Sequence, residues 1–248
     1  GIVLLNIGVY LYFIPGTPPA FTMSPEQAQK QRAAALWALE RESELILVLA
    51  NGAKVTVNNS SEDLPDDDFG ITSLKLYDDQ PLDQNSLAPL KDINSLQELR
   101  LDDCVLRDDA LAAIKGLTSL TLLDLHNTKL TDKGLSHIST LKKLKTLSIK
   151  LNPGLTDNGL QVLNQLSRLE DVDLARLGIT DNGINFIQNN PNLFKLNISE
   201  TKVSDASAPM IKALKNLKVL FVKKSALSDQ GIENVRDAYK DRDPIRYD

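Results

Sequence analysis

An apolar pattern repeats along most of this chain at a nearly constant interval, and the repeat constrains the fold more than any other feature. Each copy begins with three apolar residues in the spacing i, i+3 and i+5. The seven triplets are Ile71/Leu74/Leu76, Leu96/Leu99/Leu101, Leu120/Leu123/Leu125, Leu144/Leu147/Ile149, Leu169/Val172/Leu174, Leu193/Leu196/Ile198 and Leu217/Leu220/Val222. Successive copies start 24 or 25 residues apart. Such a period is typical of solenoids, in which each repeat stacks on its neighbours.

Each copy is expected to contain a short strand followed by a short helix. The residues at i+3 and i+5 lie two apart, so they point to the same face of a strand. Further along each copy the apolar spacing becomes three, as in Leu135/Ile138/Leu141, which is the buried stripe of a helix.

A polar turn joins the two elements, and it reads Leu-Thr-Asp-Lys-Gly-Leu over residues 130–135. Its glycine is expected to allow close packing between coils. Short polar side chains can accept hydrogen bonds from the free amides that open a helix, and aspartate also suits the positive end of the helix dipole. We therefore expect helix caps at Asp108, Asp132, Asp157, Asp181, Asp205 and Asp229.

The pattern LxxLxLxxNxL formed by these residues resembles leucine-rich repeats. The recurring LTDxGL turn is similar to bacterial leucine-rich-repeat proteins of the planctomycete type and to the cysteine-containing repeats of F-box proteins. The resemblance covers residues 53–240 and implies an α/β right-handed solenoid with a concave parallel sheet and convex short helices. It also implies a polar ladder at the Asn position of the motif, formed by Cys104, Thr128, Asn152, Thr201 and Ser225. Leu177 holds that position in the fifth coil, so the ladder is expected to be interrupted there.

The repeats are expected to need a cap at their N-terminal end, because no coil buries its own apolar face. Ser24-Pro25-Glu26-Gln27 is typical of an N-cap, a first-turn proline and a capping-box glutamine, opening a helix through Ala33–Trp37 whose furthest end is Ala50. A capping strand is expected at residues 54–57. The chain thus divides into an apolar segment (1–16), a linker with helix and capping strand (17–60), an acidic loop (61–70), seven repeats (71–240) and a polar tail (241–248).

The first segment is unusually apolar. Residues 2–14 carry no charge, yet 13 residues are fewer than the roughly 20 that a membrane-spanning helix needs. We expect the distal part of a single-pass transmembrane anchor, with a buried helix, a buried strand or a signal-peptide remnant as alternatives. No Lys or Arg precedes Lys30, which under the positive-inside rule favours a periplasmic or extracytoplasmic solenoid.

Composition and motifs argue against several functions. The formal net charge of −5 argues against binding nucleic acid by neutralising phosphates. A single cysteine excludes an intrachain disulfide, and no glycine-rich phosphate loop, HExxH, CxxC or GxSxG motif is present. His126 beside Asp124 resembles an acid–base pair, but no nucleophile accompanies it. We therefore expect no enzyme activity, cofactor, metal or small-molecule substrate.

The surface expected to act is the concave face, onto which the residues at i+2, i+4 and i+6 should point. Its mixed charges favour a protein ligand recognised by charge complementarity, with Phe221 as an anchor. The candidate binding residues are Tyr77, Arg100, Asp102, Asp124, His126, Lys150, Asp171, Asp173, Lys195, Phe221 and Lys223.

The sequence thus predicts a non-catalytic protein–protein interaction module, specifically a membrane-anchored accessory or scaffold subunit whose partners are integral membrane proteins. Two alternatives stay open. One is a soluble or surface receptor or adaptor, F-box-like, that recruits another enzyme. The other is an appendage of an enzyme whose catalytic domain lies in sequence upstream of Gly1.

Overall fold

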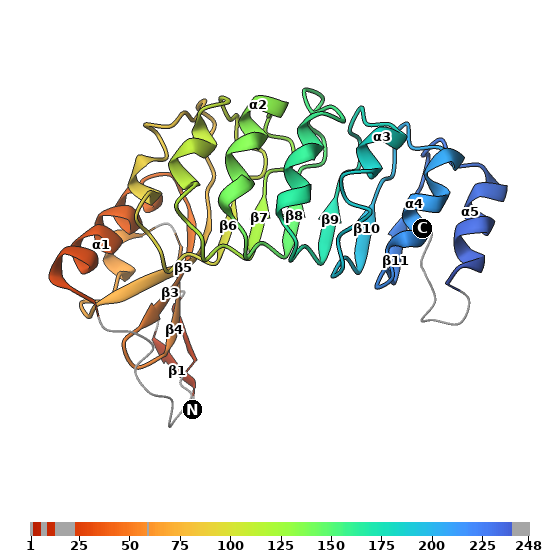
Figure 1. Ribbon diagram of the computed structural model, residues 1–248. Helices are drawn as coiled ribbons and strands as arrows, with labels where there is room; N and C mark the ends of the chain where they lie inside the picture. The colour runs from red at the N-terminus through yellow and green to blue at the C-terminus, as the bar shows by residue number, and fades with distance from the viewer. Residues whose placement is uncertain (1, 6–8, 13–22, 59, 240–248) are drawn as a thin grey trace.

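The computed structural model describes residues 2–5, 9–12, 23–58 and 60–239. They form an arc of stacked coils, with strands along its inner side and short helices along its outer side (Figure 1). One sheet runs through these residues in the order β1-β2-β4-β3-β5-β6-β7-β8-β9-β10-β11. From β5 onward all neighbouring strands are parallel. This repeated, parallel strand-and-helix arrangement is a leucine-rich-repeat solenoid.

The strands of the solenoid overlap the predicted triplets, and all but β5, which begins two residues earlier, begin within them. They are β5 (Phe69–Lys75), β6 (Glu98–Arg100), β7 (Leu122–Asp124), β8 (Thr146–Ser148), β9 (Asp171–Asp173), β10 (Lys195–Asn197) and β11 (Val219–Phe221). The middle residue of each three-residue strand is buried, and the register stacks these residues in one column, for example Leu123 beside Leu147. The core is therefore a stack of leucine layers, which no single coil could bury alone.

The outer side of the arc carries one or two helical turns per coil. The α-helices there are α2 (Asp132–Leu135), α3 (Asp181–Ile184), α4 (Ala208–Ala213) and α5 (Asp229–Asp237). 3-10 helical segments occupy Ser61–Asp63, Ala88–Leu90, Ala110–Ile114, Ser136–Thr140, Gly159–Gln165 and Asp205–Ser207. A coil of about 24 residues leaves no room for a longer helix once its strand and two turns are made.

The N-terminal cap combines a helix with a strand pair. Helix α1 (Pro25–Leu39) begins with the predicted capping box, in which Ser24 Oγ accepts from Gln27 N at 3.2 Å and Gln27 Oε1 accepts from Ser24 N at 3.1 Å. The helix includes Ala33–Trp37 as predicted, and it ends well before Ala50, the furthest end that the sequence allowed. The chain turns at Glu42, whose φ is 53°, and then enters β3 (Glu44–Leu49).

Strand β3 buries alternate residues, and it lies between β4 (Lys54–Asn58) and β5, antiparallel to both. Burial of every second residue is typical of a strand. Residues 44–49 therefore form a strand rather than a continuation of helix α1. The segment expected to be an acidic loop contains a 3-10 turn at Ser61–Asp63 and the first residues of β5.

The segment expected to be part of a membrane anchor contains two strands instead. Strand β1 (Ile2–Leu5) pairs antiparallel with β2 (Val9–Tyr12), and Tyr12 of β2 pairs with Lys54 of β4. None of the helices in the described part of the chain is long and apolar enough to cross a membrane. The structure therefore gives no support to the expected transmembrane segment. The linker at 17–22 and the tail at 241–248 lie outside the described residues.

Candidate functional site

The polar ladder lies just after the inner strands, where the chain turns toward the outer side. Asn152 is fully buried, and its Nδ2 donates to the carbonyls of Leu125 and Ile149, both at 2.8 Å. Thr128 donates to Leu125 O at 2.9 Å within its own coil. Leu177 is buried and has no polar side-chain atom, so the ladder is interrupted in that coil.

The other ladder residues behave less uniformly. Thr201 donates to Ile198 O at 2.7 Å, whereas Ser225 is partly exposed and accepts from Leu227 N at 3.4 Å. The Cys104 thiol lies 3.5 Å from Leu76 O, and burial raises its pKa to about 11. Because the thiolate is the reactive form, this cysteine is a structural group rather than a nucleophile.

The recurrent aspartates do not cap their own helices, which corrects the sequence-based prediction. The N-cap residue is the preceding Thr or Ser in some coils, as at Thr180 and Ser228, and Asp109 or Asn158 in others. Five of the six aspartates accept instead from the Thr or Ser at the same turn of the next coil: Asp157 accepts from Thr180 N at 2.8 Å and from Thr180 Oγ1 at 2.6 Å. Asp132, Asp181 and Asp205 make both corresponding bonds, and Asp108 accepts from Thr131 Oγ1 at 2.6 Å. We call Asp157 and these four residues the aspartate ladder. Asp229 follows in the last coil.

On the concave face, most of the predicted charged residues pair with one another. Lys75 lies 3.3 Å from Asp102, Lys150 lies 3.7 Å from Asp173, and Lys195 lies 2.8 Å from Asp171. Arg100 pairs with Glu98 at 3.0 Å. Ion pairs at a surface contribute little to stability, but they neutralise one another and leave less net charge for a partner to recognise.

The C-terminal coils present a different surface. Phe194, directly before β10, is 42% exposed, and Val219 and Phe221 on β11 are partly exposed. Lys223 is exposed and makes no ion pair with the described residues. Residues 193–228 contain seven lysines and two acidic residues, whereas residues 60–135 contain 16 acidic and seven basic residues. The solenoid is thus acidic at one end and basic with aromatic side chains at the other.

Phe194 was missed by the sequence analysis, which considered only the positions i+2, i+4 and i+6 of each copy. It occupies i+1, where Thr121 and Lys145 stand in earlier coils. An aromatic residue at a position otherwise held by polar residues is the signal that could have identified it.

At the other end of the face, Tyr77 is 47% exposed. The ammonium of Lys75 lies over the Tyr77 ring, 4.9 Å from the ring centre.

The pair formed by Asp124 and His126 is present, and it belongs to a larger group. Asp124 Oδ1 lies 3.2 Å from His126 Nδ1, and His126 Nε2 lies 3.6 Å from Asp103 Oδ2. Asp102, on the preceding coil, also lies near this imidazole. The period explains the grouping, because a residue lies beside the one 24 positions later, and His126 follows Asp102 by that interval.

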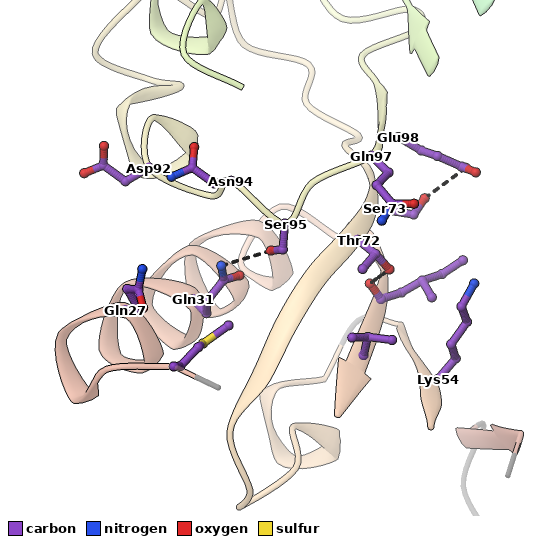
Figure 2. A pocket seen from close by; sticks show the side chains of 13 residues that line it. Gln27, Gln31, Lys54, Thr72, Ser73, Asp92, Asn94, Ser95, Gln97 and Glu98 are labelled. Carbon is purple, nitrogen blue, oxygen red and sulfur yellow. Dashed lines mark hydrogen bonds between the residues drawn. The ribbon is translucent and has the colours of Figure 1, made fainter. Parts of the chain in front are cut away.

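A pocket of about 530 Å³ lies where α1, β3 and the first coils meet (Figure 2). Its polar side chains bond one another: Gln31 donates to Ser95 Oγ at 3.0 Å, and Ser95 Oγ donates to Ile71 O at 2.8 Å. Gln31 Oε1 also accepts from Ile71 N at 2.9 Å. These bonds attach the cap helix to the first two coils, so Gln31 and Ser95 have a structural role in this pocket.

The fold and these surfaces define a leucine-rich-repeat solenoid with a mixed-charge concave face. No protein-family model and no curated protein sequence matches the chain.

Solved structures do match. An internalin (InlF) of Listeria monocytogenes is 21% identical with a TM-score of 0.54, and the match covers 68% of this chain and 52% of that one. An internalin C2 of the same organism is 22% identical with a TM-score of 0.55, and the match covers 83% and 88%. The match thus spans about half the length of the InlF chain. At these identities the likeness shows the fold alone.

Proposed function

We propose that this chain is a non-catalytic protein-binding module whose partner docks on the C-terminal end of the concave face. We call this surface, made of Phe194, Val219, Phe221 and Lys223, the aromatic end. The observation that carries the proposal is the contrast along the face. The charges of the central coils are paired, whereas the aromatic end exposes two phenylalanines beside a lysine that makes no ion pair with the described residues.

The chemistry of the aromatic end indicates what it binds. Aromatic side chains that become fully desolvated contribute most to the affinity of protein interfaces. The excess of lysines in residues 193–228 favours a partner with carboxylates around an apolar side chain, because complementary charge speeds association and selects the partner. The partner is therefore a protein segment in which aspartate or glutamate flanks one or two large apolar residues.

Site-specific photocrosslinking tests this proposal. A photoreactive phenylalanine analogue at position 221 should capture the partner in an extract of the source organism, whereas the same analogue at position 77 should not. The captured protein is then purified, and its affinity for Phe221→Ala and Lys223→Glu variants is measured. We expect Phe221→Ala to weaken binding by at least about tenfold, which corresponds to about 1.4 kcal/mol.

The matched control is Tyr77→Ala, because Tyr77 is as exposed as Phe194 but lies at the opposite end of the face. Its affinity should stay within about twofold of the unmodified protein. Equal capture at positions 77 and 221, or an unchanged affinity for Phe221→Ala, would contradict docking at the aromatic end.

The absence of catalysis is part of the same proposal. Asp124 and His126 hydrogen-bond to each other, and Asp124 also accepts from the backbone amide of His126 at 3.1 Å, so this carboxylate has a structural task. An adaptor that recruits an enzyme would use the same surface, and the identity of the captured partner decides between a scaffold subunit and an adaptor.

Location is a separate proposal, and it rests on the apolar composition of residues 2–14. An accessory subunit attached to a membrane complex outside the cytoplasm would stay with the membrane fraction after washing with dilute buffer. Release into buffer without detergent would contradict attachment and leave the binding proposal intact.

A further inference from the structure

We propose that Asp102, Asp103 and His126 form a binding site for a divalent transition-metal ion on the concave face. One carboxylate oxygen from each aspartate and one imidazole nitrogen lie within 4.8 Å of one another. Two coils supply these groups, since Asp102 and Asp103 follow β6 and His126 follows β7. An ion there would join neighbouring coils. The site does not depend on the partner proposed above.

Two of the three groups are held so that one ligand atom stays available. Asn127 Nδ2 donates to Asp103 Oδ1 at 2.7 Å, which leaves Asp103 Oδ2 facing the imidazole. Asp124 Oδ1 hydrogen-bonds to His126 Nδ1 at 3.2 Å. The other ring nitrogen, Nε2, therefore faces Asp103. A carboxylate that receives the second N–H of a ligating imidazole is the usual support of a histidine ligand, because it fixes the ring and raises its basicity.

Asp102 provides an independent observation. Its side chain is only 11% exposed, and its Oδ1 is buried without a hydrogen-bond partner among the described residues. Its Oδ2 lies 3.3 Å from the ammonium of Lys75. A buried carboxylate oxygen without a partner is costly, so a cation or a donor at this point would relieve an unfavourable arrangement.

The donor set indicates the class of ion. An imidazole nitrogen with two carboxylate oxygens suits Zn²⁺ and similar transition ions, whereas Mg²⁺ and Ca²⁺ prefer oxygen donors alone. Ligand atoms of a tetrahedral zinc site lie about 3.3 Å apart, close to the 3.6 Å between His126 Nε2 and Asp103 Oδ2. Three protein ligands leave a fourth position for water or for a group of a docked partner.

The test is calorimetric titration of untagged protein with Zn²⁺, with Mg²⁺ and Ca²⁺ as comparison ions. We expect one Zn²⁺ to bind per chain, and His126→Ala to weaken the affinity at least about 100-fold. The matched control is His137→Ala, which removes the other histidine of the chain, on the outer side, and should leave the affinity unchanged. Zinc binding that survives His126→Ala, or that His137→Ala abolishes, would overturn the proposal.

Two further variants separate a built site from loose binding. Asp124→Asn should weaken Zn²⁺ binding about 10- to 100-fold, because Asp124 is a positioning residue for the imidazole. Lys75→Met should tighten binding, because it removes a competing positive charge from Asp102.

Nuclear magnetic resonance gives a readout that does not rely on affinity. With only two histidines in the chain, the imidazole signals of His126 should shift on adding Zn²⁺ while those of His137 stay in place. Equal shifts of both would indicate an adventitious ion only and would overturn the assignment.

Discussion

Two sets of polar side chains run along the solenoid, and they follow different rules. The polar ladder changes identity from coil to coil through Cys104, Thr128, Asn152, Leu177, Thr201 and Ser225. The aspartate ladder keeps one residue type at each of its five positions. The bonds of the polar ladder also vary from coil to coil. Thr128 and Thr201 donate to a carbonyl of their own coil, whereas Cys104 and Asn152 reach a carbonyl of the preceding coil. Every ladder aspartate, in contrast, accepts from the hydroxyl of a Thr or Ser in the next coil.

A bond between coils constrains three positions at once. The aspartate needs a Thr or Ser in the next coil to donate to it, and a small residue three positions after that Thr or Ser. A Cβ atom added at Gly159 would lie 2.2 Å from Asp132 Oδ1. Ser207 occupies the corresponding position after Ser204, and its hydroxyl donates to Asp181 Oδ1. The contact between aspartate and small residue therefore selects Gly, or Ser where the hydroxyl can bond.

The largest effect is expected in the polar ladder, at Asn152. Its Oδ1 accepts from Thr128 N and Leu130 N, both at 3.0 Å, and its side chain is fully buried. Asn152→Leu leaves these buried amides without partners and should lower the free energy of unfolding by about 3 kcal/mol or more. Urea denaturation measures the loss. Leu177→Ala serves as a comparison, since it makes a cavity but orphans no polar group. A loss below about 1 kcal/mol for Asn152→Leu would show that the ladder is dispensable there as well.

A smaller effect is expected from Gly159→Ala. The new methyl group would meet Asp132 Oδ1 at 2.2 Å and Asp132 Cα at 3.3 Å, so the two coils must separate, at a cost of about 1–3 kcal/mol. Gly159→Ser should cost less, because its hydroxyl can donate to Asp132 as Ser207 does to Asp181. The control is Gly178→Ala, where nothing lies within 4 Å of the added atom. Thermal unfolding of the three variants would contradict the argument if Gly178→Ala were the least stable.

Removing one member of the aspartate ladder should cost less again. Asp157→Ala loses two hydrogen bonds from Thr180, and hydrogen bonds to a charged group contribute about 1.5–3 kcal/mol when buried. Because this site is partly exposed, we expect a loss of about 1–2 kcal/mol. Asp229→Ala is the matched control, since no later coil follows it among the described residues, and it should change stability by less than about 0.5 kcal/mol. Equal losses would mean that these aspartates act through their own helices.

These comparisons also show what the sequence could and could not predict. The strands follow from apolar residues spaced by two within a fixed period, and the polar ladder follows from the leucine-rich-repeat motif. The aspartates were misinterpreted because helix capping is a local interaction that any single coil can satisfy. Their true partners lie 23 or 24 residues away, as Thr180 does from Asp157 and Thr156 from Asp132. Only stacking brings such residues together.

The N-terminal cap and the group around His126 were predicted less well for the same reason. Residues 44–49 form a strand because they complete a sheet with β4 and β5, and no pattern within the preceding helix predicts this pairing. The grouping of Asp102, Asp103 and His126 likewise depends on the stacking of two coils. A period of 24 residues, applied to the polar as well as the apolar positions, would have predicted both the grouping of His126 with Asp102 and the aspartate ladder.

The smallest effect is expected from the charge state of the aspartate ladder. At Asp181 burial raises the pKa, but hydrogen bonds from Ser207 and from the amide and hydroxyl of Ser204 outweigh it, and the pKa is lowered from 3.8. A carboxylate whose pKa is lower in the folded state stabilises the fold above the unfolded pKa, and this contribution is lost as the pH falls through the folded value. Ser207→Ala should therefore destabilise the protein at pH 7 and show a smaller difference from the unmodified protein near pH 3. Urea denaturation at both pH values measures it. A difference that does not shrink in acid would mean that the Ser207 hydroxyl stabilises the coil independently of the charge of Asp181.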